Sequence, residues 1–293
     1  MATFAAIVLA ALVALALAEA AVRLLRIDQF PLFTTGGYEL YRMAPNQSGR
    51  LFGRIDWSYD RHGMRSEADL VSLAGAMILL GDSVVDGGAN ASQDDTVMAV
   101  LGRIVGRAPY PVACHGWSLA NALEALSGLP TWEHAEWLVC VVNAGDFDGC
   151  ARAASPLSFP TRRPRFLVLW LLRRHFFRRP PRWWPWRTPN PVFHVDPEFR
   201  AGLVTRFAEM AHRFRGSILI VYIPMNPEIV DEVEFCRILA AAAPDAQLLD
   251  AGKSTSWGKD CYADYIHPNT HGRTELARLI AGHVLASVRR HTS

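Results

Sequence analysis

The sequence predicts an α/β protein of the three-layer, flavodoxin-like kind, in which helices cover both faces of a parallel sheet of about five strands. Short apolar runs bounded by Gly, Pro or Asp alternate along the chain with longer amphipathic stretches. Strands that alternate with helices build parallel sheets, and a sheet covered on both faces needs strands that are apolar on both sides. A further pattern, an apolar run at the N-terminus, adds a membrane helix to this core.

Composition indicates a folded protein and gives no sign of nucleic acid, metal or cofactor. The chain has 293 residues, of which 51% are hydrophobic and 20% charged, and this excludes a disordered chain. A formal net charge of +2 indicates no nucleic-acid partner. The five cysteines form no C-x-x-C pair, so we expect neither a zinc site nor a disulfide framework, and a single bridge stays open. His267 and His271 have helical spacing but no third ligand nearby.

Residues 1–26 are expected to be a membrane anchor or signal segment. The run from Phe4 to Ala18 contains no polar residue, and residues 3–22 together approach the roughly 20 apolar residues that a membrane-spanning helix needs. Small residues offer a cleavage site after Ala18, but no Lys or Arg precedes the run, which favours an uncleaved anchor. The alternative is a buried core helix. Arg23 and Arg26 follow the run, and a positive-inside interpretation would place the rest of the chain in the cytoplasm, so charge does not settle the orientation.

The remaining chain divides into a short extension and a larger domain. Residues 27–74 are expected to be an irregular N-terminal extension, and residues 75–293 carry the alternation of strands and helices. Strands are expected at 76–80, 111–114, 137–143, 217–223 and 247–250. Helices are expected at 96–105, 119–126, 197–214, 228–242 and 272–289.

An insertion rich in arginine and aromatic residues, residues 160–191, interrupts this alternation. It contains nine arginines and several Trp and Phe residues around the apolar core FLVLWLL. One interpretation is an arginine-rich surface excursion. A second is an interfacial segment whose apolar core enters the acyl boundary of a membrane while its arginines meet lipid phosphates. A third is a binding site for an acidic or glycan polymer. The apolar core is too short for a second membrane span.

The stretch AMILLGDSVVDGG, residues 76–88, points to a nucleophile. It places Ser83 at the carboxyl end of the first expected strand, where ligands of parallel sheets bind. A serine hydroxyl needs a base, and the base needs a group that orients it. Asp264 and His267 lie three residues apart near the other end of the chain, a spacing that lets the carboxylate orient the imidazole. The elbow G-x-S-x-G does not fit, because position 85 is valine.

These residues resemble the motifs of the SGNH, or GDSL, hydrolase family. The first family block, G-D-S-x-x-x-G, is matched by Gly81, Asp82, Ser83 and Gly87, and the last, D-x-x-H-P, by Asp264, His267 and Pro268. The segment RHGMRS, residues 61–66, is similar to the G-[FY]-R segment of membrane-anchored members. The resemblance implies a triad of Ser83, His267 and Asp264, and it implies that Gly87 lies where the backbone approaches another group.

The middle blocks depart from the family pattern around the expected oxyanion hole. Gly116 matches the second block without its usual lead-in residues, and His115 beside it is expected to line the pocket. The third block, normally G-x-N-D, reads NAGD, so that Gly145 stands where the family has its oxyanion asparagine. Asp146 ends this block and is expected, like Gly87, among the oxyanion or substrate residues. Asn143 is therefore one candidate for the missing donor, with a turn role as its alternative. Backbone N–H groups of Ser83 and Gly116 are the other candidates.

The resemblance implies a membrane-anchored serine esterase that acts through an acyl-enzyme on Ser83. The implied substrate is an O-acyl group, above all O-acetyl, on an envelope or secreted polysaccharide, and transfer to a sugar hydroxyl stays open beside hydrolysis. Such a substrate would place the domain outside the cytoplasm. A lipid-directed esterase or lysophospholipase is one alternative, because of the 160–191 insertion. The other is a non-catalytic glycan-binding or assembly protein with a degenerate site.

Overall fold

One parallel sheet organises the protein. The computed structural model describes residues 1–36, 40–67, 71–147, 149, 157–178, 196–225, 232–243 and 245–292. The sheet has five strands in the order β6-β5-β7-β8-β9, all paired in parallel. Their bounds are β5 Met77–Gly81, β6 Tyr110–Ala113, β7 Trp137–Val142, β8 Ser217–Tyr222 and β9 Gln247–Asp250. Numbered within the sheet, this order is 2-1-3-4-5, the flavodoxin-like order, and the predicted fold class is confirmed.

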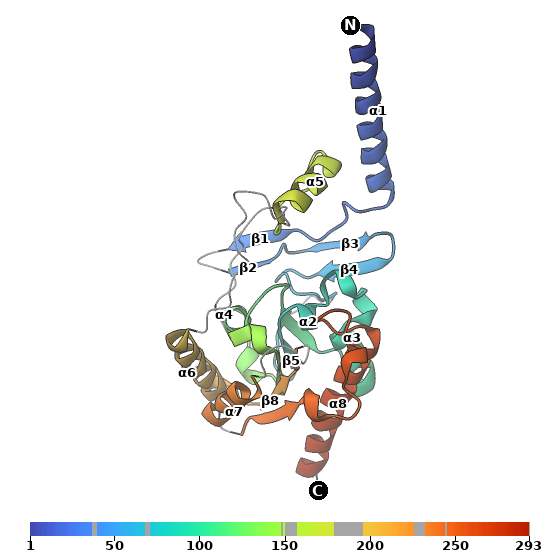
Figure 1. Cartoon of the computed structure of the whole chain (residues 1–293). Coiled ribbons are helices and arrows are strands. Elements are labelled where there is room, and N and C mark those ends of the chain that lie inside the picture. The colour runs from blue at the N-terminus through green and yellow to red at the C-terminus, as the bar shows by residue number, and fades with distance from the viewer. Residues whose placement is uncertain are drawn as a thin grey trace.

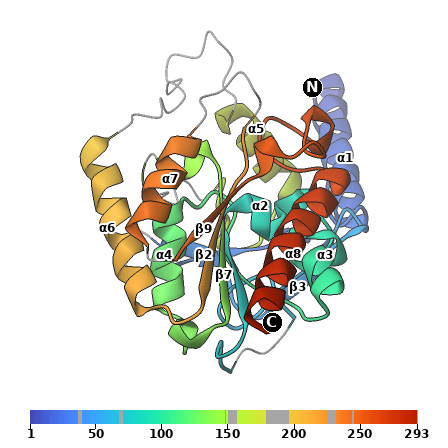
Figure 2. The same ribbon diagram turned by 90° about the horizontal axis from the view of Figure 1, so that it is seen from below.

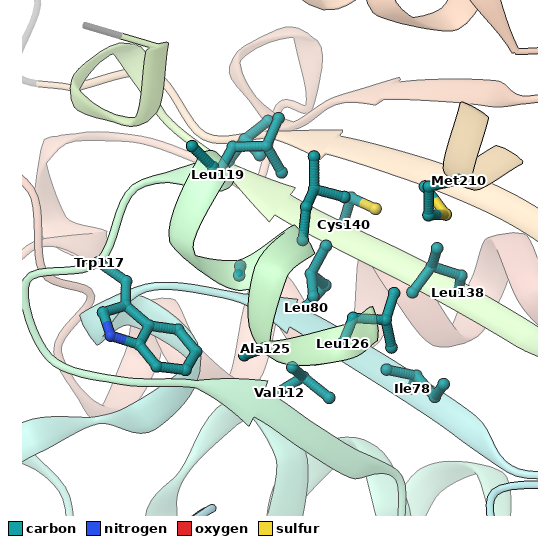
Figure 3. Close-up of a cluster of buried hydrophobic side chains, with 14 of the residues drawn as sticks. Ile78, Leu80, Val112, Trp117, Leu119, Ala125, Leu126, Leu138, Cys140 and Met210 are labelled. Carbon is teal, nitrogen blue, oxygen red and sulfur yellow. The ribbon is translucent and has the colours of Figure 1, made fainter. Parts of the chain in front are cut away.

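Helices cover both faces of the sheet, so the molecule has three layers (Figure 2). One face is covered by α4 (Leu119–Ser127), α6 (Pro197–Arg213) and α7 (Val233–Ala242), and the other by α3 (Val97–Val105) and α8 (Thr270–Thr292). Successive strand residues alternate between the two cores, as the pleat requires. Figure 3 shows the first core, where Ile78 and Leu80 of β5 meet Leu138 and Cys140 of β7 beneath α4. The strands are therefore apolar on both faces.

Residues 27–74 differ from the expected irregular segment. They contain two antiparallel hairpins, β1 (Phe33–Gly36) with β2 (Leu40–Met43) and β3 (Gln47–Leu51) with β4 (Ile55–Tyr59). No apolar run in the sequence indicates these hairpins. Strand β3, for example, has the sequence QSGRL and exposes alternate side chains. The hairpins lie between the sheet and the N-terminal helix (Figure 1).

The N-terminal helix α1 (Ala2–Leu24) projects away from the rest of the molecule (Figure 1). Its segment Thr3–Leu24 is long and apolar enough to cross a membrane, with a mean hydropathy of 2.5, and its side chains are not covered by the protein. This exposure excludes the buried-core alternative. A signal sequence or a membrane anchor both have this form.

A second apolar helix, α5 (Leu167–Arg178), lies beside the last turns of α1. The Glu19 carboxylate of α1 accepts hydrogen bonds from the backbone N–H groups of Leu167 and Val168, both at 2.9 Å. A carboxylate at a helix N-terminus satisfies N–H groups that have no partner within the helix. The apolar core of the 160–191 insertion is therefore a helix tied to α1, whereas residues 179–191 lie outside the described part of the chain.

Candidate active site

The turn after β5 presents Ser83. Gly81 ends the strand at a point where a β-carbon would lie 3.0 Å from the Val141 carbonyl oxygen, so the position has no room for a side chain. Asp82 then caps the one-turn helix α2 (Ser83–Asp86), its Oδ1 accepting from the Val84 N–H at 2.8 Å. Ser83 is the first helical residue, at the carboxyl edge of the sheet. Gly81, the helix cap Asp82 and Ser83 are thus consecutive because the chain turns sharply from β5 into α2.

The structure brings Ser83, His267 and Asp264 together, as the spacing predicted. Ser83 Oγ lies 2.9 Å from His267 Nε2, and His267 Nδ1 lies 2.8 Å from Asp264 Oδ2. An ionised carboxylate can only accept, so Nδ1 of the neutral ring carries the hydrogen and Nε2 accepts from the serine hydroxyl. This is the tautomer that a base acting on serine needs.

Asp264 is held in its charged form by local hydrogen bonds. Partial burial raises the pKa of Asp264, but the backbone N–H groups of His267 and Ile266, at 2.8 and 2.9 Å, and the His267 ring lower it by more. The net pKa is below the usual value for aspartate. The carboxylate is therefore charged at neutral pH and orients the ring of its own loop.

The loop that carries Asp264 and His267 is closed by backbone contacts. The Ala263 N–H donates to the His267 carbonyl at 2.8 Å, and the Asn269 side chain donates to the Asp260 carbonyl at 2.6 Å. At the start of α8, a β-carbon on Gly272 would lie 2.0 Å from the Cys261 carbonyl oxygen. These contacts give the histidine a single position above Ser83.

Arg65 is a positioning residue that sequence reasoning left out of the site. Its guanidinium is 1% exposed and donates to four backbone carbonyls, on Asp56, Asp86, Gly88 and Ala91, at 2.6 to 3.2 Å. Three of these carbonyls belong to the last residue of α2 and to the chain just after it. The similarity of RHGMRS, which contains Arg65, to the G-[FY]-R segment is the sequence feature that could have indicated this role. Arg65 thus ties the N-terminal extension to the nucleophile turn.

Gly87 has the close approach that the resemblance implies. Its φ is +77°, a left-handed conformation that favours glycine, and it ends α2. A β-carbon there would lie 3.2 Å from an Arg65 nitrogen and 3.0 Å from the Ala91 side chain. The predicted residue therefore occupies a position that only glycine fills without strain.

Gly116 and Asn143, the candidate oxyanion groups, are placed differently. Gly116 is exposed, has φ +79°, and has the Tyr41 hydroxyl where a β-carbon would point. Within the described residues, the N–H groups of Ser83 and Gly116 donate to no protein acceptor. By contrast, Asn143 is 2% exposed, and its side-chain N–H groups donate to Asp146 at 2.9 Å and to Asp82 at 3.2 Å. Its amide is thus directed to buried carboxyl groups.

Asp82 and Asp146 form a buried carboxyl pair beneath Ser83. Burial raises the pKa of Asp146 well above its ordinary value, and the charge of Asp82 raises it further. Burial also raises the pKa of Asp82, against hydrogen bonds from Val84 and Asn143. Asn143 lies between the two carboxyl groups. The backbone N–H of Asn143 also donates to Asp146 Oδ2, at 2.8 Å. Burial and the charge of Asp82 thus favour the protonated form of Asp146, whose side chain contacts Asn143.

His115 lies beside the triad and lines an apolar cavity. Its ring is nearly parallel to that of His267, with 6.5 Å between centroids. The cavity has a volume of about 320 Å³ and extends from Gly88 and His115 to α5. His115 was expected to line a pocket, and it does so.

One further cluster could hold a metal ion by its ligand types. Ligand atoms of Asp260, Cys261 and His271 lie within 4.8 Å of one another. Burial raises the pKa of the Cys261 thiol, which disfavours the thiolate that binds metals. His267 does not belong to this cluster. The described cysteines, Cys114, Cys140, Cys236 and Cys261, form no disulfide with one another, and Cys150 lies outside the described residues.

No family model matches the sequence, and no curated protein matches it. Among solved structures, the chain is similar to a family two carbohydrate esterase from Clostridium thermocellum in complex with cellohexaose (11% identity, 75% of this chain and 66% of that chain, TM-score 0.44). It is also similar to an acetyl xylan esterase from Butyrivibrio proteoclasticus (9% identity, 75% of this chain and 66% of that chain, TM-score 0.44).

A third similar structure is a putative lipolytic protein of the G-D-S-L family from Desulfitobacterium hafniense (12% identity, 71% of this chain and 98% of that chain, TM-score 0.44). The chain thus spans slightly less than two thirds of the length of the first two esterases. Its own geometry places Ser83 after the first strand of a five-stranded parallel sheet, with Asp264 and His267 before the last helix. This is the arrangement of an SGNH-like fold.

Proposed function

We propose that this protein is a serine esterase that forms an acyl-enzyme on Ser83. The observation that carries the proposal is the continuous hydrogen-bond chain from Ser83 Oγ through the His267 ring to Asp264, with links of 2.9 and 2.8 Å. Three residues from opposite ends of the domain meet in the order that nucleophilic catalysis requires.

The proposed reaction has two steps. Ser83 Oγ attacks the carbonyl carbon of an ester while its proton passes to His267 Nε2. The C–O bond to the alcohol then breaks, and the alcohol oxygen leaves with that proton. In the second step a water molecule attacks the acyl-enzyme, gives a proton to His267 and releases the acid, and Ser83 recovers its hydrogen. If a sugar hydroxyl replaces water, the acyl group is transferred instead.

The backbone N–H groups of Ser83 and Gly116 are proposed to bind the oxyanion. Support comes from the absence of an acceptor for either group in the described part of the chain, and from the exposure of Gly116. The engagement of Asn143 with Asp82 and Asp146 disfavours its amide as a third donor. One donor fewer costs on the order of 3 kcal/mol of transition-state stabilisation, so we expect a slow enzyme.

Two substrate classes fit the proposed esterase. The resemblance to anchored SGNH hydrolases favours O-acetyl groups of an envelope or secreted polysaccharide. A lipid-directed esterase is favoured by a specific observation, the apolar cavity that begins at Gly88 and His115. In both cases α1 is proposed as an uncleaved anchor, residues 1–26, that holds an extracytoplasmic domain of residues 75–293 at the membrane.

Labelling with a fluorophosphonate tests the esterase without knowledge of the substrate. We expect covalent modification of Ser83, identified by mass spectrometry, and loss of labelling in Ser83→Ala. In His267→Ala the rate should fall at least a hundredfold, and hydrolysis of p-nitrophenyl acetate should follow the same pattern. Ser127→Ala, an exposed serine on α4, is the matched control. An unlabelled Ser83 in the folded wild type would favour the non-catalytic glycan-binding alternative.

A further inference from the structure

Three parts of the chain supply the large apolar side chains in the walls of the cavity next to the triad. The N-terminal hairpins contribute Leu51, Ile55 and Trp57, the segment after α1 contributes Phe30, and α5 contributes Trp170. The Phe30 and Trp170 rings stack at 5.1 Å between centroids and join α5 to the extension. The volume of about 320 Å³ lies within the range of small-molecule sites.

Two large aromatic side chains of the wall, Trp57 and Tyr59, have their polar atoms engaged elsewhere. The Trp57 indole N–H donates to the Gln29 carbonyl at 2.9 Å, and the Tyr59 hydroxyl donates to Asp86 at 3.1 Å. Their rings therefore offer hydrocarbon surface rather than hydrogen bonds to a ligand. The other polar side chains of the lining are those of His115, Ser158, Trp170 and Arg174. A sugar would leave most of its hydroxyl groups without partners here, which is costly, whereas an aliphatic chain loses nothing.

One end of the cavity lies one side chain away from His267. Gly88 and His115 both line it. Gly88 follows the α2 helix that begins with Ser83, and the His115 ring lies parallel to that of His267, at 6.5 Å between centroids. A group bound in this end is therefore a neighbour of the nucleophile and its base.

The other end of the cavity lies below the N-terminal helix. Ile27, which lines it, comes three residues after the last residue of α1. Trp170 and Leu171 of α5 close this side, while Leu169, Leu172 and Phe176 on the opposite stripe of α5 are exposed. In Figure 1, α5 lies between α1 and the hairpins. The cavity thus extends from the triad toward the part of the molecule that would face a membrane.

We propose that this cavity binds the aliphatic acyl chain of the ester that Ser83 attacks. This inference rests on the proposed esterase function and assigns its substrate class, an ester of a lipid-like acyl group rather than acetyl. The carbonyl carbon would lie at Ser83 and the chain would extend past Gly88 and His115 between Trp57 and Trp170. Burial of each methylene group should raise kcat/KM about threefold to fourfold until the cavity is full.

The test compares alkyl fluorophosphonates with an ethyl or an octyl chain. The full chain is held in a steroidal detergent, which has no alkyl chain to compete for the cavity, and the second-order rate of Ser83 labelling is measured by mass spectrometry. We expect the octyl probe to react at least tenfold faster than the ethyl probe. Ala89→Trp, at an exposed position on the cavity wall, should lower this octyl-to-ethyl ratio at least fivefold.

A matched control and a second cavity variant make the result specific to the cavity. Ala201→Trp, at an exposed position of α6 outside the cavity, should leave the ratio unchanged. Leu171→Trp narrows the cavity from α5 and should lower the ratio like Ala89→Trp, which guards against a folding defect in either variant. Thermal unfolding of each variant is measured in parallel.

The outcomes separate this inference from the proposed function. Equal labelling by both probes, or a ratio unchanged by both cavity variants, overturns the acyl-chain site and leaves the esterase standing. No labelling by either probe overturns both. A second arm identifies the source of the chain: slower octyl labelling after addition of phosphatidylcholine vesicles supports a membrane lipid as donor, and an unchanged rate supports a soluble acyl ester.

Discussion

The tautomer and the orientation of the His267 ring depend on the carboxylate of Asp264. This carboxylate accepts two backbone N–H groups and the ring Nδ1, so its orientation is set by its own loop rather than by the body of the protein. Asp264 is 43% exposed at its side chain. Its effect on the ring is therefore one of geometry and tautomer, since water screens its charge.

Asp264→Asn should abolish the proposed esterase activity while it leaves the fold intact. The asparagine oxygen can still accept the backbone N–H groups, but its NH₂ group facing Nδ1 favours the tautomer with the hydrogen on Nε2, which cannot take a proton from Ser83. We expect labelling of Ser83 to slow by up to about 10⁴-fold, with an unchanged melting temperature. Asp245→Asn is the control. An activity within threefold of wild type would contradict the assigned role.

The buried pair of Asp82 and Asp146 affects stability rather than proton transfer. The pKa of Asp146 in the folded protein is raised above its value in the unfolded chain, so folding favours the protonated carboxyl. This contribution to the free energy of unfolding is complete below the unfolded pKa of about 3.9 and is lost as the pH rises through the raised value.

Asp146→Asn should therefore stabilise the protein increasingly as the pH rises. Asparagine keeps an oxygen for the two N–H groups of Asn143 and removes the charge. Relative to the wild type, the free energy of unfolding should rise with pH by at most about 1.4 kcal/mol per unit, measured by urea unfolding at pH 5 and pH 8. The exposed Asp94→Asn should show no such trend. An equal loss of stability at both pH values would contradict a neutral Asp146.

At the scale of elements, the sequence predicted the apolar strands and the contacts between residues that are close in sequence. The strand over residues 217–222 was predicted almost to the residue, because it is buried and apolar on both faces. The half-buried strand over residues 247–250 was predicted with the same bounds from its two leucines. The hairpins of the extension were missed, because half-exposed strands such as QSGRL carry no apolar run. The i, i+3 spacing of Asp264 and His267 was visible, but the partners of Asn143 were not. One of these partners, Asp82, lies 61 residues away.

Arg65→Lys should uncouple the extension from the nucleophile turn. A lysine ammonium has three donors on one atom and cannot reach the four carbonyls that the guanidinium joins. With at least one buried carbonyl left unpaired, we expect a loss of about 3 kcal/mol in the free energy of unfolding and a slower labelling of Ser83. Arg54→Lys, at an exposed arginine in the turn between β3 and β4, is the control. Equal stability of the two variants would contradict this role.

At the scale of the whole molecule, the apolar features gather at one end. Helices α1 and α5 both lie on the side of the hairpins away from the sheet (Figure 1). Leu169, Leu172 and Phe176 of α5 are exposed, and its Trp170 and Leu171 line the apolar cavity. The Arg23 guanidinium of α1 donates to the Arg165 carbonyl at 2.8 Å and adds to the Glu19 contacts that hold α5 in place. This common direction favours the interfacial interpretation of the 160–191 insertion over a surface excursion or a polymer site.

Helix α5 should lie in the membrane interface when the full chain is reconstituted in phospholipid bilayers. Leu169, Leu172 and Phe176 are 48 to 58% exposed and share one face of the helix, so water would meet three large apolar groups if no lipid covered them. A spin label on Phe176→Cys should be relaxed more by oxygen, which concentrates in lipid, than by a water-soluble nickel chelate. The same label on Ala201→Cys in α6 should show the reverse. A label at position 176 that is as accessible to the chelate as the control would place α5 in water, and the cavity behind it would then open to solvent rather than to lipid.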